Sequence, residues 1–280
     1  MRRLHSPGIV LAIALFAGAA STQQVQETSA NDLVRRVVAN ELRAQDEDHS
    51  HWMYRLETKD RGKTEIRGII ETRDGDLSRL LCVNDLPLSE DEQRKEDQRI
   101  QKLASHASQQ QKLQQARNED GDEARRLLTM LPDALLYSYR ESRGDLVRLD
   151  FRPNPAFRPP SREAHVFHEM GGEIWVDAKQ DRLVKISGRL IHDVRFAGGL
   201  LGHLDQGGRF EVMQSEVAPG HWEMTLLDVN MKGRVLLFKT IGVQRRERRS
   251  DFRRVPDNLT LAQAADILRR QTLATSNQSV

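Results

Sequence analysis

Two histidines and a glutamate stand together at residues 165–169, which read His-Val-Phe-His-Glu. A zinc hydrolase needs H-E-x-x-H or H-x-x-E-H on a helix, because both imidazoles must share one face with the glutamate as base. The order here is H-x-x-H-E, between a proline-rich segment and Gly171-Gly172. On a strand, positions three apart point to opposite faces. We therefore predict surface histidines here and no metal site.

A second set of possible metal ligands lies at residues 46–51, which read Asp-Glu-Asp-His-Ser-His. Carboxylates and imidazoles can bind a divalent ion, but the spacing of an EF-hand loop is missing. The end of a helix followed by solvated polar residues produces the same pattern. We favour this second interpretation, keep a metal site as the alternative, and predict no cofactor.

No motif for nucleophilic catalysis is present in the sequence. The serines lack a G-x-S-x-G elbow, and the single cysteine, Cys82, lies in an apolar run where a small buried core residue is expected. The glycines at 198–202 lack the G-x-x-x-x-G-K-[ST] pattern of a phosphate-binding loop. We therefore predict no catalytic residues and a protein that is not an enzyme, with an exported enzyme of unrecognised type as the alternative.

Aromatic and methionine side chains in three expected strands could line a ligand cavity. An apolar wall that contains methionine adapts to varied ligands, although sheet core is the ordinary role of such residues. The candidate lining residues are Trp52, Tyr54, Trp175, Trp222, Met224 and Leu226.

A cluster of arginines near the C-terminus could contact anionic lipid headgroups or an acidic partner. Arg245, Arg246, Arg248 and Arg249 surround a single acidic residue, Glu247. A solvated strand end is the alternative explanation for this cluster.

The elements that must position these residues begin with a helix over 31–46, where Leu33, Val34, Val37 and Val38 recur at helical spacing. Three strands are expected over 52–56, 66–70 and 77–83. Asp74-Gly75 is a good hairpin signal, because glycine accepts the positive φ of tight turns.

Two more helices are expected in the middle of the chain. The capping box Ser89-Glu90-Asp91-Glu92 starts a long polar helix, about 89–118, whose sparse apolar positions suit a surface helix. Residues 118–122, which include Gly121, are expected to break it. A further helix then carries a leucine stripe and ends near Pro132.

From Leu136 onward the sequence indicates antiparallel hairpins, followed by a last helix from the capping box at 260–263. Residues 230–233 are predicted to be a turn that leads into a strand over 235–243. Because helices and strands are segregated, we predict an α+β fold with a large curved antiparallel sheet, an unclosed barrel with helices packed on its concave face.

The N-terminus indicates export. Arg2 and Arg3, a short apolar block at 8–16 and small residues at 17–21 form a signal-peptide pattern over 1–20. No cysteine follows it for lipidation, and no later apolar segment is long enough to span a bilayer. We predict a soluble periplasmic protein with one domain over 21–272, in which helix 89–118 is an insertion, and a flexible tail over 273–280.

The charge balance argues against nucleic acid as a partner. The chain has 43 basic and 41 acidic residues, so removal of Arg2 and Arg3 leaves a net charge near zero. A nucleic-acid-binding protein is expected to keep a basic excess.

The element order behind a signal peptide resembles the periplasmic lipoprotein-carrier superfamily, the LolA- and LolB-like proteins with the related RseB and MucB regulators. The local features are the helix leading into Trp52-Met53-Tyr54, the hairpin opening at 172–177 followed by 182–186, and the strand at 233–238. The resemblance implies an unclosed barrel around helices, with an apolar cavity for acyl chains.

We therefore predict a non-catalytic exported protein that binds a lipid or the acyl chains of a lipoprotein. The alternative is an envelope sensor or protein-interaction module of the RseB type, which could contact a membrane surface or an envelope protein through the polar helix and the arginines.

Overall fold

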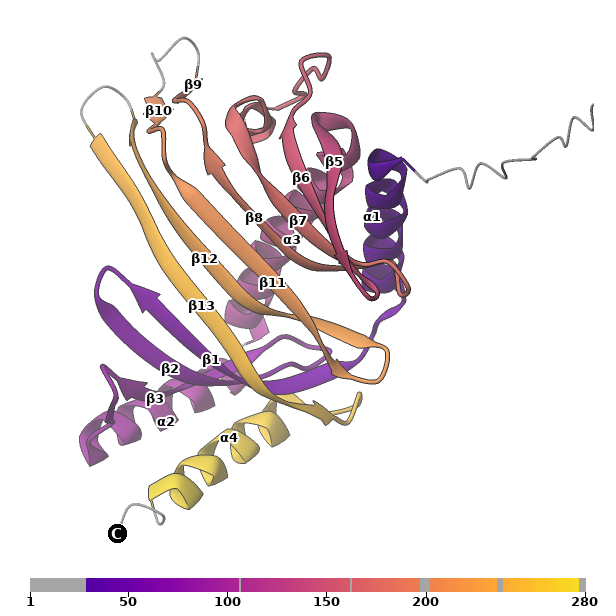
Figure 1. The fold of residues 1–280 in the computed structure, drawn as a ribbon. Coiled ribbons are helices and arrows are strands. Elements are labelled where there is room, and N and C mark those ends of the chain that lie inside the picture. The colour runs from indigo at the N-terminus through magenta and orange to yellow at the C-terminus, as the bar shows by residue number, and fades with distance from the viewer. Residues whose placement is uncertain (1–28, 106, 162, 197–201, 236–238, 277–280) are drawn as a thin grey trace, which may run out of the picture.

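A single open antiparallel sheet dominates the computed structural model, which describes residues 29–276 except 106, 162, 197–201 and 236–238. The sheet has thirteen strands and is not closed into a barrel, which confirms the predicted fold class (Figure 1). Its path runs through β4 (Leu86–Pro87), β3 (Leu77–Val83), β2 (Lys63–Ile70), β1 (His51–Asp60), β13 (Lys239–Val255), β12 (His221–Val235), β11 (Arg209–Ala218), β8 (Arg182–Leu190), β7 (Met170–Asp177), β6 (Leu146–Pro153) and β5 (Leu135–Arg143). The short strands β9 (Val194–Phe196) and β10 (Gly202–Leu204) extend it beside β12.

Helices cover the sheet in two places. The helix α1 (Ala30–Glu47) and the end of α3 (Ala107–Ala134) pack on β5 to β8, where they form the largest apolar core together with the 3-10 helix η1 (Glu163–Glu169). The helices α2 (Glu90–Ser105) and α4 (Leu261–Ser276) pack on β1 to β3 at the other end of the sheet. In the described ranges, no helix has an apolar run long enough to cross a membrane.

The two helix pairs lie on opposite faces of the sheet. On β1, Met53 packs into the core under α2 and α4, whereas Trp52 and Tyr54 point the other way. The strand register places Trp52 and Tyr54 on the face that carries α1, because side chains of a strand alternate between the faces. The prediction that helices pack on one face of the sheet thus describes α1 and α3. The helices α2 and α4 form a further layer on the other face, over β1 to β3.

The predicted helix starts are confirmed by their hydrogen bonds. Ser29 accepts from the amide of Asp32 at the start of α1. The capping box before α2 forms as expected, with the Ser89 amide donating to Glu92 at 2.9 Å, and Thr260 with Gln263 repeats this arrangement before α4.

The expected helix break at 118–122 is wrong. The helix α3 runs without interruption through Gly121, so the residues expected to break the polar helix lie inside α3. A glycine inside a helix costs only about 1 kcal/mol relative to alanine. Packing of Leu127, Leu128 and Leu131 into the main core is enough to outweigh that cost.

The expected turn at 230–233 and the strand over 235–243 are also wrong. β12 continues through these residues to Val235 and pairs with β13 over its whole second half. Gly233 serves close packing here, because a Cβ on it would lie 2.1 Å from the carbonyl oxygen of His203. Residues 236–238, between β12 and β13 in the sequence, lie outside the described residues.

The two terminal segments named in the sequence analysis lie mostly outside the described residues. The expected signal peptide over 1–20 lies entirely in the undescribed N-terminal segment. The expected tail over 273–280 begins too early, because α4 continues to Ser276. No glycine or proline in that stretch interrupts the helix.

Helix side chains pair with backbone groups near both edges of the open sheet. At the β5 edge, Asn31 of α1 accepts from the amide of Tyr137 and donates to the carbonyl oxygens of Leu135 and Pro132. At the β3 edge, Glu96 of α2 accepts from the amide of Leu80 at 2.7 Å. Unpaired strand edges invite pairing with other chains, so these contacts protect the sheet.

Replacing Asn31 tests this edge contact. Asn31→Ala should lower the free energy of unfolding by about 2–3 kcal/mol, because backbone groups left unpaired in a part-buried position cost about 1–3 kcal/mol. Asn31→Asp keeps an acceptor for Tyr137 and loses the two donated bonds, so its loss should be smaller. Urea unfolding would measure both, with exposed Arg43→Ala as control. Equal stability of all three variants would contradict the edge role.

Candidate functional site

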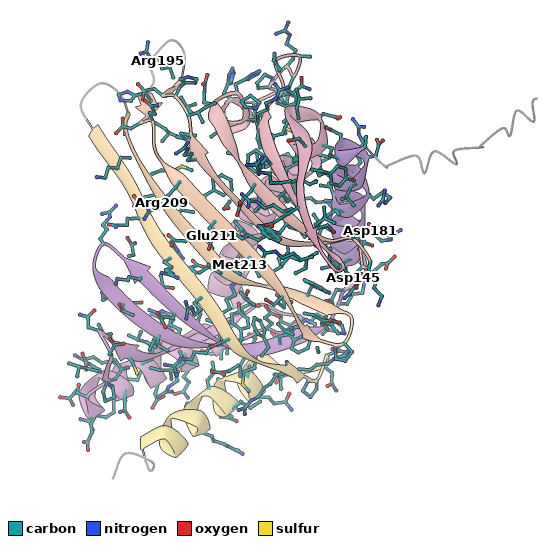
Figure 2. The ribbon with its side chains drawn as sticks, in the orientation of Figure 1. Asp145, Asp181, Arg195, Arg209, Glu211 and Met213 are labelled. Atoms are coloured by element: carbon teal, nitrogen blue, oxygen red, sulfur yellow. The ribbon has the colours of Figure 1, made fainter. Side chains whose placement is uncertain are left out.

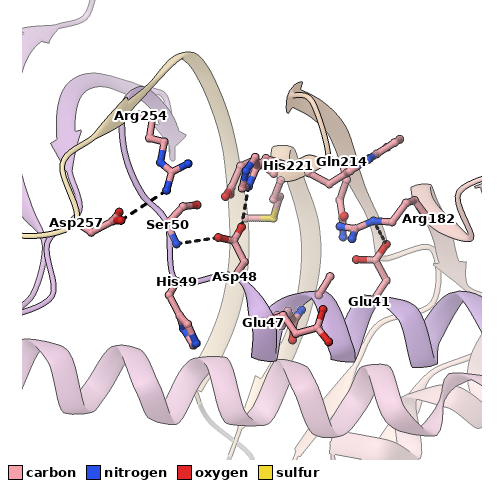
Figure 3. A pocket seen from close by; sticks show the side chains of 16 residues that line it. Glu41, Glu47, Asp48, His49, Ser50, Arg182, Gln214, His221, Arg254 and Asp257 are labelled. Atoms are coloured by element: carbon pink, nitrogen blue, oxygen red, sulfur yellow. Dashed lines mark hydrogen bonds and ion pairs between the residues drawn. The ribbon is translucent and has the colours of Figure 1, made fainter.

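A hollow lies where α1 ends and β1 begins, beside the hairpin of β11 and β12 and the end of β13 (Figure 3). Its volume is about 730 Å³, within the usual range for small-molecule sites. We call it the α1 pocket. The side chains that line it are mainly polar or charged, including Glu41, Glu47, Asp48, His49, Arg182, Gln214, His221, Glu223, Arg254 and Asp257.

A buried ion pair forms one end of the α1 pocket. Glu41 is 2% exposed and its Oε1 lies 3.1 Å from Arg182 Nε. The same carboxylate accepts from the Leu183 amide at 2.7 Å. Burial raises the pKa of Glu41, and the Leu183 amide with Arg182 partly offsets that rise. The Arg182 guanidinium also lies 5.5 Å from the ring centroid of Trp222, so three elements meet here.

An aspartate–histidine pair occupies the centre of the α1 pocket. His221 Nδ1 lies 3.3 Å from Asp48 Oδ2, and the Ser50 amide donates to the other carboxylate oxygen of Asp48. Desolvation opposes ionisation of Asp48, but the hydrogen bonds from Ser50 and His221 outweigh it and lower its pKa. The His221 ring meets the edge of Trp52 at 5.5 Å between centroids. The pair thus joins the end of α1 to β12.

The opposite end of the α1 pocket carries a second set of charges. Arg254 Nη2 lies 3.6 Å from Asp257 Oδ2, and His51 Nδ1 lies 3.8 Å from Asp257 Oδ1. Five carboxylates and two guanidinium groups line the pocket, which gives it a net charge of −3 when its imidazoles are neutral. A cationic group is therefore attracted into it.

The hydroxyl group next to the aspartate–histidine pair is engaged elsewhere. A histidine oriented by an aspartate can act as a base, but the nearby Ser50 hydroxyl accepts from the Trp52 indole and is not bonded to His221. Among the described residues, no group of three His, Cys, Asp or Glu side chains could hold a metal ion. Residues 165–169 belong to η1, and Glu169 at its end lies 2.9 Å from His192.

Of the six candidate lining residues, two line the α1 pocket. Trp222 and Met224 are both in its wall. Trp52 and Tyr54 lie on the same sheet face, but they are buried against Ile69 and Phe252 and fill space rather than line it.

Trp175 and Leu226 lie on the opposite face of the sheet. Leu226 pairs with Met213 and Met224 pairs with Gln214, so Thr225 is an extra residue that turns Met224 and Leu226 to different sides. Figure 2 shows this opposite face along β11, with Arg209, Glu211 and Met213. The cross-strand row that holds both predicted residues is Arg148, Trp175, Lys185, Met213, Leu226 and Arg248.

The four candidate arginines do not form one patch. Arg245 and Arg249 flank Glu247 on the face of the α1 pocket, and Arg249 also lies over the ring of Tyr54. Arg246 and Arg248 point to the other face, where Arg246 lies 3.9 Å from Asp228. The cluster is the middle of β13 rather than a strand end, and a strand sends alternate side chains to opposite faces.

The sequence reasoning missed Glu41, Arg182 and His221. Glu41 carried a usable signal, since it lies on the apolar stripe of α1, seven residues after Val34 and four after Val37. A charge at such a position is rarely buried without a partner. Nothing in the local sequence of Arg182 or His221 indicated that they would meet α1.

The buried pair gives a stability prediction. Glu41→Leu leaves the Arg182 charge buried and unpaired, which should cost about 3–5 kcal/mol of unfolding free energy. The double variant Glu41→Leu/Arg182→Met removes both charges and should be more stable than Glu41→Leu alone. Urea unfolding measures this, with exposed Glu47→Leu on the same helix as control. A double variant less stable than Glu41→Leu would contradict the pairing.

The lowered pKa of Asp48 gives a pH prediction. A carboxyl whose pKa is lower in the folded state adds stability above its unfolded pKa, about 3.9, and loses it as the pH falls through the folded value. Asp48→Asn should therefore lower the melting temperature at pH 7, and this difference should shrink below pH 4. Asp145→Asn makes the same charge change at an exposed turn and should show no such trend. A difference that is constant from pH 7 to pH 2 would refute the assignment.

Comparisons with protein-family models, with curated proteins and with solved structures found no match to this chain.

Proposed function

We propose that this chain is an exported, non-catalytic binding protein that holds its ligand in the α1 pocket. The observation that carries the proposal is a hollow of about 730 Å³ whose polar side chains are held by contacts between separate elements. Glu41 ties α1 to β8, Asp48 ties the end of α1 to β12, and Asp257 pairs with the end of β13. Groups fixed before the ligand arrives lose less entropy on binding.

Export rests on the sequence pattern over residues 1–20, which has the charge, apolar block and small residues of a signal peptide. A periplasmic location is therefore part of the proposal. The fate of the first twenty residues can be read from the mass of the protein recovered from the envelope fraction of an expressing bacterium.

Lipid or acyl-chain carriage is the second candidate function. It is favoured by Trp222 and Met224, which give the α1 pocket an apolar wall next to its charged groups. Transfer of a methylene from water to such a wall is worth about 0.8 kcal/mol when it is fully buried. The charged lining admits an amphiphile more readily than a bare hydrocarbon chain.

A fragment screen by ligand-detected NMR tests the proposed site. Several fragments should bind the full chain, and Ala44→Trp, which fills the pocket from α1, should abolish their binding. Arg43→Trp places the same side chain on an exposed neighbour outside the pocket and should leave it intact. If no fragment binds, or if Ala44→Trp has no effect, the proposal fails.

A fluorescent fatty acid separates the two candidates with the same variants. Uptake that Ala44→Trp blocks and Arg43→Trp does not would support acyl carriage. An absence of uptake together with fragment binding would remove the second candidate and leave the first.

A further inference from the structure

We infer that the ligand of the α1 pocket carries an ammonium group together with a carboxylate or a phosphate. The inference rests on the proposed function, because it names the ligand class of the same pocket. Amino acids, peptides and zwitterionic lipid headgroups share this chemistry.

Arg182 supplies the anchor for the anionic group. It is 8% exposed and lines the α1 pocket, and its Nε faces Glu41 Oε1 at 3.1 Å. The Glu41 carboxylate already accepts from the Leu183 amide. A planar guanidinium presents several N–H groups in a fork that matches carboxylate and phosphate oxygens. The contact with Glu41 is made through Nε, so the Nη end of the guanidinium, which Figure 3 shows turned toward the middle of the pocket, can meet an anionic group from outside the chain.

The rest of the lining selects against a ligand that is only anionic. The five carboxylates leave the pocket at −3 even after the two guanidinium groups are counted, and they belong to Glu41, Glu47, Asp48, Glu223 and Asp257. An anion that reached Arg182 would meet these carboxylates at close range, where repulsion is strong. A ligand that also carries an ammonium group turns this repulsion into attraction.

Charged groups are spread along the whole length of the α1 pocket. Figure 3 shows Arg182 with Glu41 at one end and Arg254 with Asp257 at the other, with Asp48 and His221 between them. Trp222 and Met224 form an apolar part of the wall, against which the methylene or methyl groups that link the two ligand charges can pack. The volume of about 730 Å³ leaves room for a group larger than a single amino acid.

Titration of the full chain with four probes tests the ligand class, with NMR of the protein as the readout. Glycine betaine and phosphocholine each carry both charges, whereas choline and acetate carry one each. Both zwitterions should bind at least tenfold more tightly than choline or acetate. Triglycine and phosphatidylcholine vesicles then separate the two sources, a peptide or a lipid headgroup.

Variants of the pocket wall complete the test. Arg182→Lys keeps the charge and loses the fork, so zwitterion affinity should fall at least fivefold. Because Arg182 is buried, a second variant, Glu223→Gln/Asp257→Asn, changes the rim instead and should weaken binding at least tenfold. Asp74→Asn/Asp145→Asn makes the same net charge change far from the pocket and should bind as the parent does.

The inference is overturned if choline or acetate binds as tightly as the zwitterions, if none of the four probes binds, or if the rim variant binds as the control does. Fragment binding that Ala44→Trp blocks would still stand in each of these cases. A failed ligand class is therefore distinguishable from a failed binding site.

Discussion

The carboxylate of Glu41 holds α1 on the sheet at the place where the strands lose register. β7 and β8 pair Trp175 with Lys185 and Val176 with Leu183, so Val184 is an extra residue on β8. Glu41 accepts the Leu183 amide at this irregularity and balances the charge of Arg182. Without a charged partner inside the fold, the buried guanidinium would cost several kcal/mol. The position of α1, and with it the hollow at its end, depends on this contact.

An open sheet has backbone groups to pair at its two edges and side chains to cover on its two faces. The helices supply most of the groups that pair with the edges and cover the faces. Asn31 and Glu96 pair with backbone groups at the two edges. Apolar faces of α1 and α3 cover one end of the sheet, and α2 with α4 cover the other face at the far end. The face of β6 to β8 and β11 that faces away from α1 carries cross-strand ion pairs instead, such as Lys185 with Glu211 and Glu173.

The α1 pocket lies where these two packing arrangements meet. The pocket is enclosed by the end of α1, the hairpin of β11 and β12 and the C-terminal end of β13. More of the side chains that line it are charged than apolar. The extra residue Thr225 turns Met224 toward the pocket and Leu226 away from it. Irregular pairing thus selects which side chains line the pocket, and more of them are charged than apolar.

The local sequence determined the helix starts, the strand alternation and the α+β class. Ser29, Ser89 and Thr260 act through neighbours within three residues, and apolar spacing reports which residues seek a core. Tertiary structure alone decided the register of the long β12–β13 hairpin, the passage of α3 through Gly121, and the meeting of Arg182 and His221 with α1. Extra residues such as Val184 and Thr225 come from pairing between strands. A one-residue shift in that pairing reverses every side chain beyond it, and no local pattern records the shift.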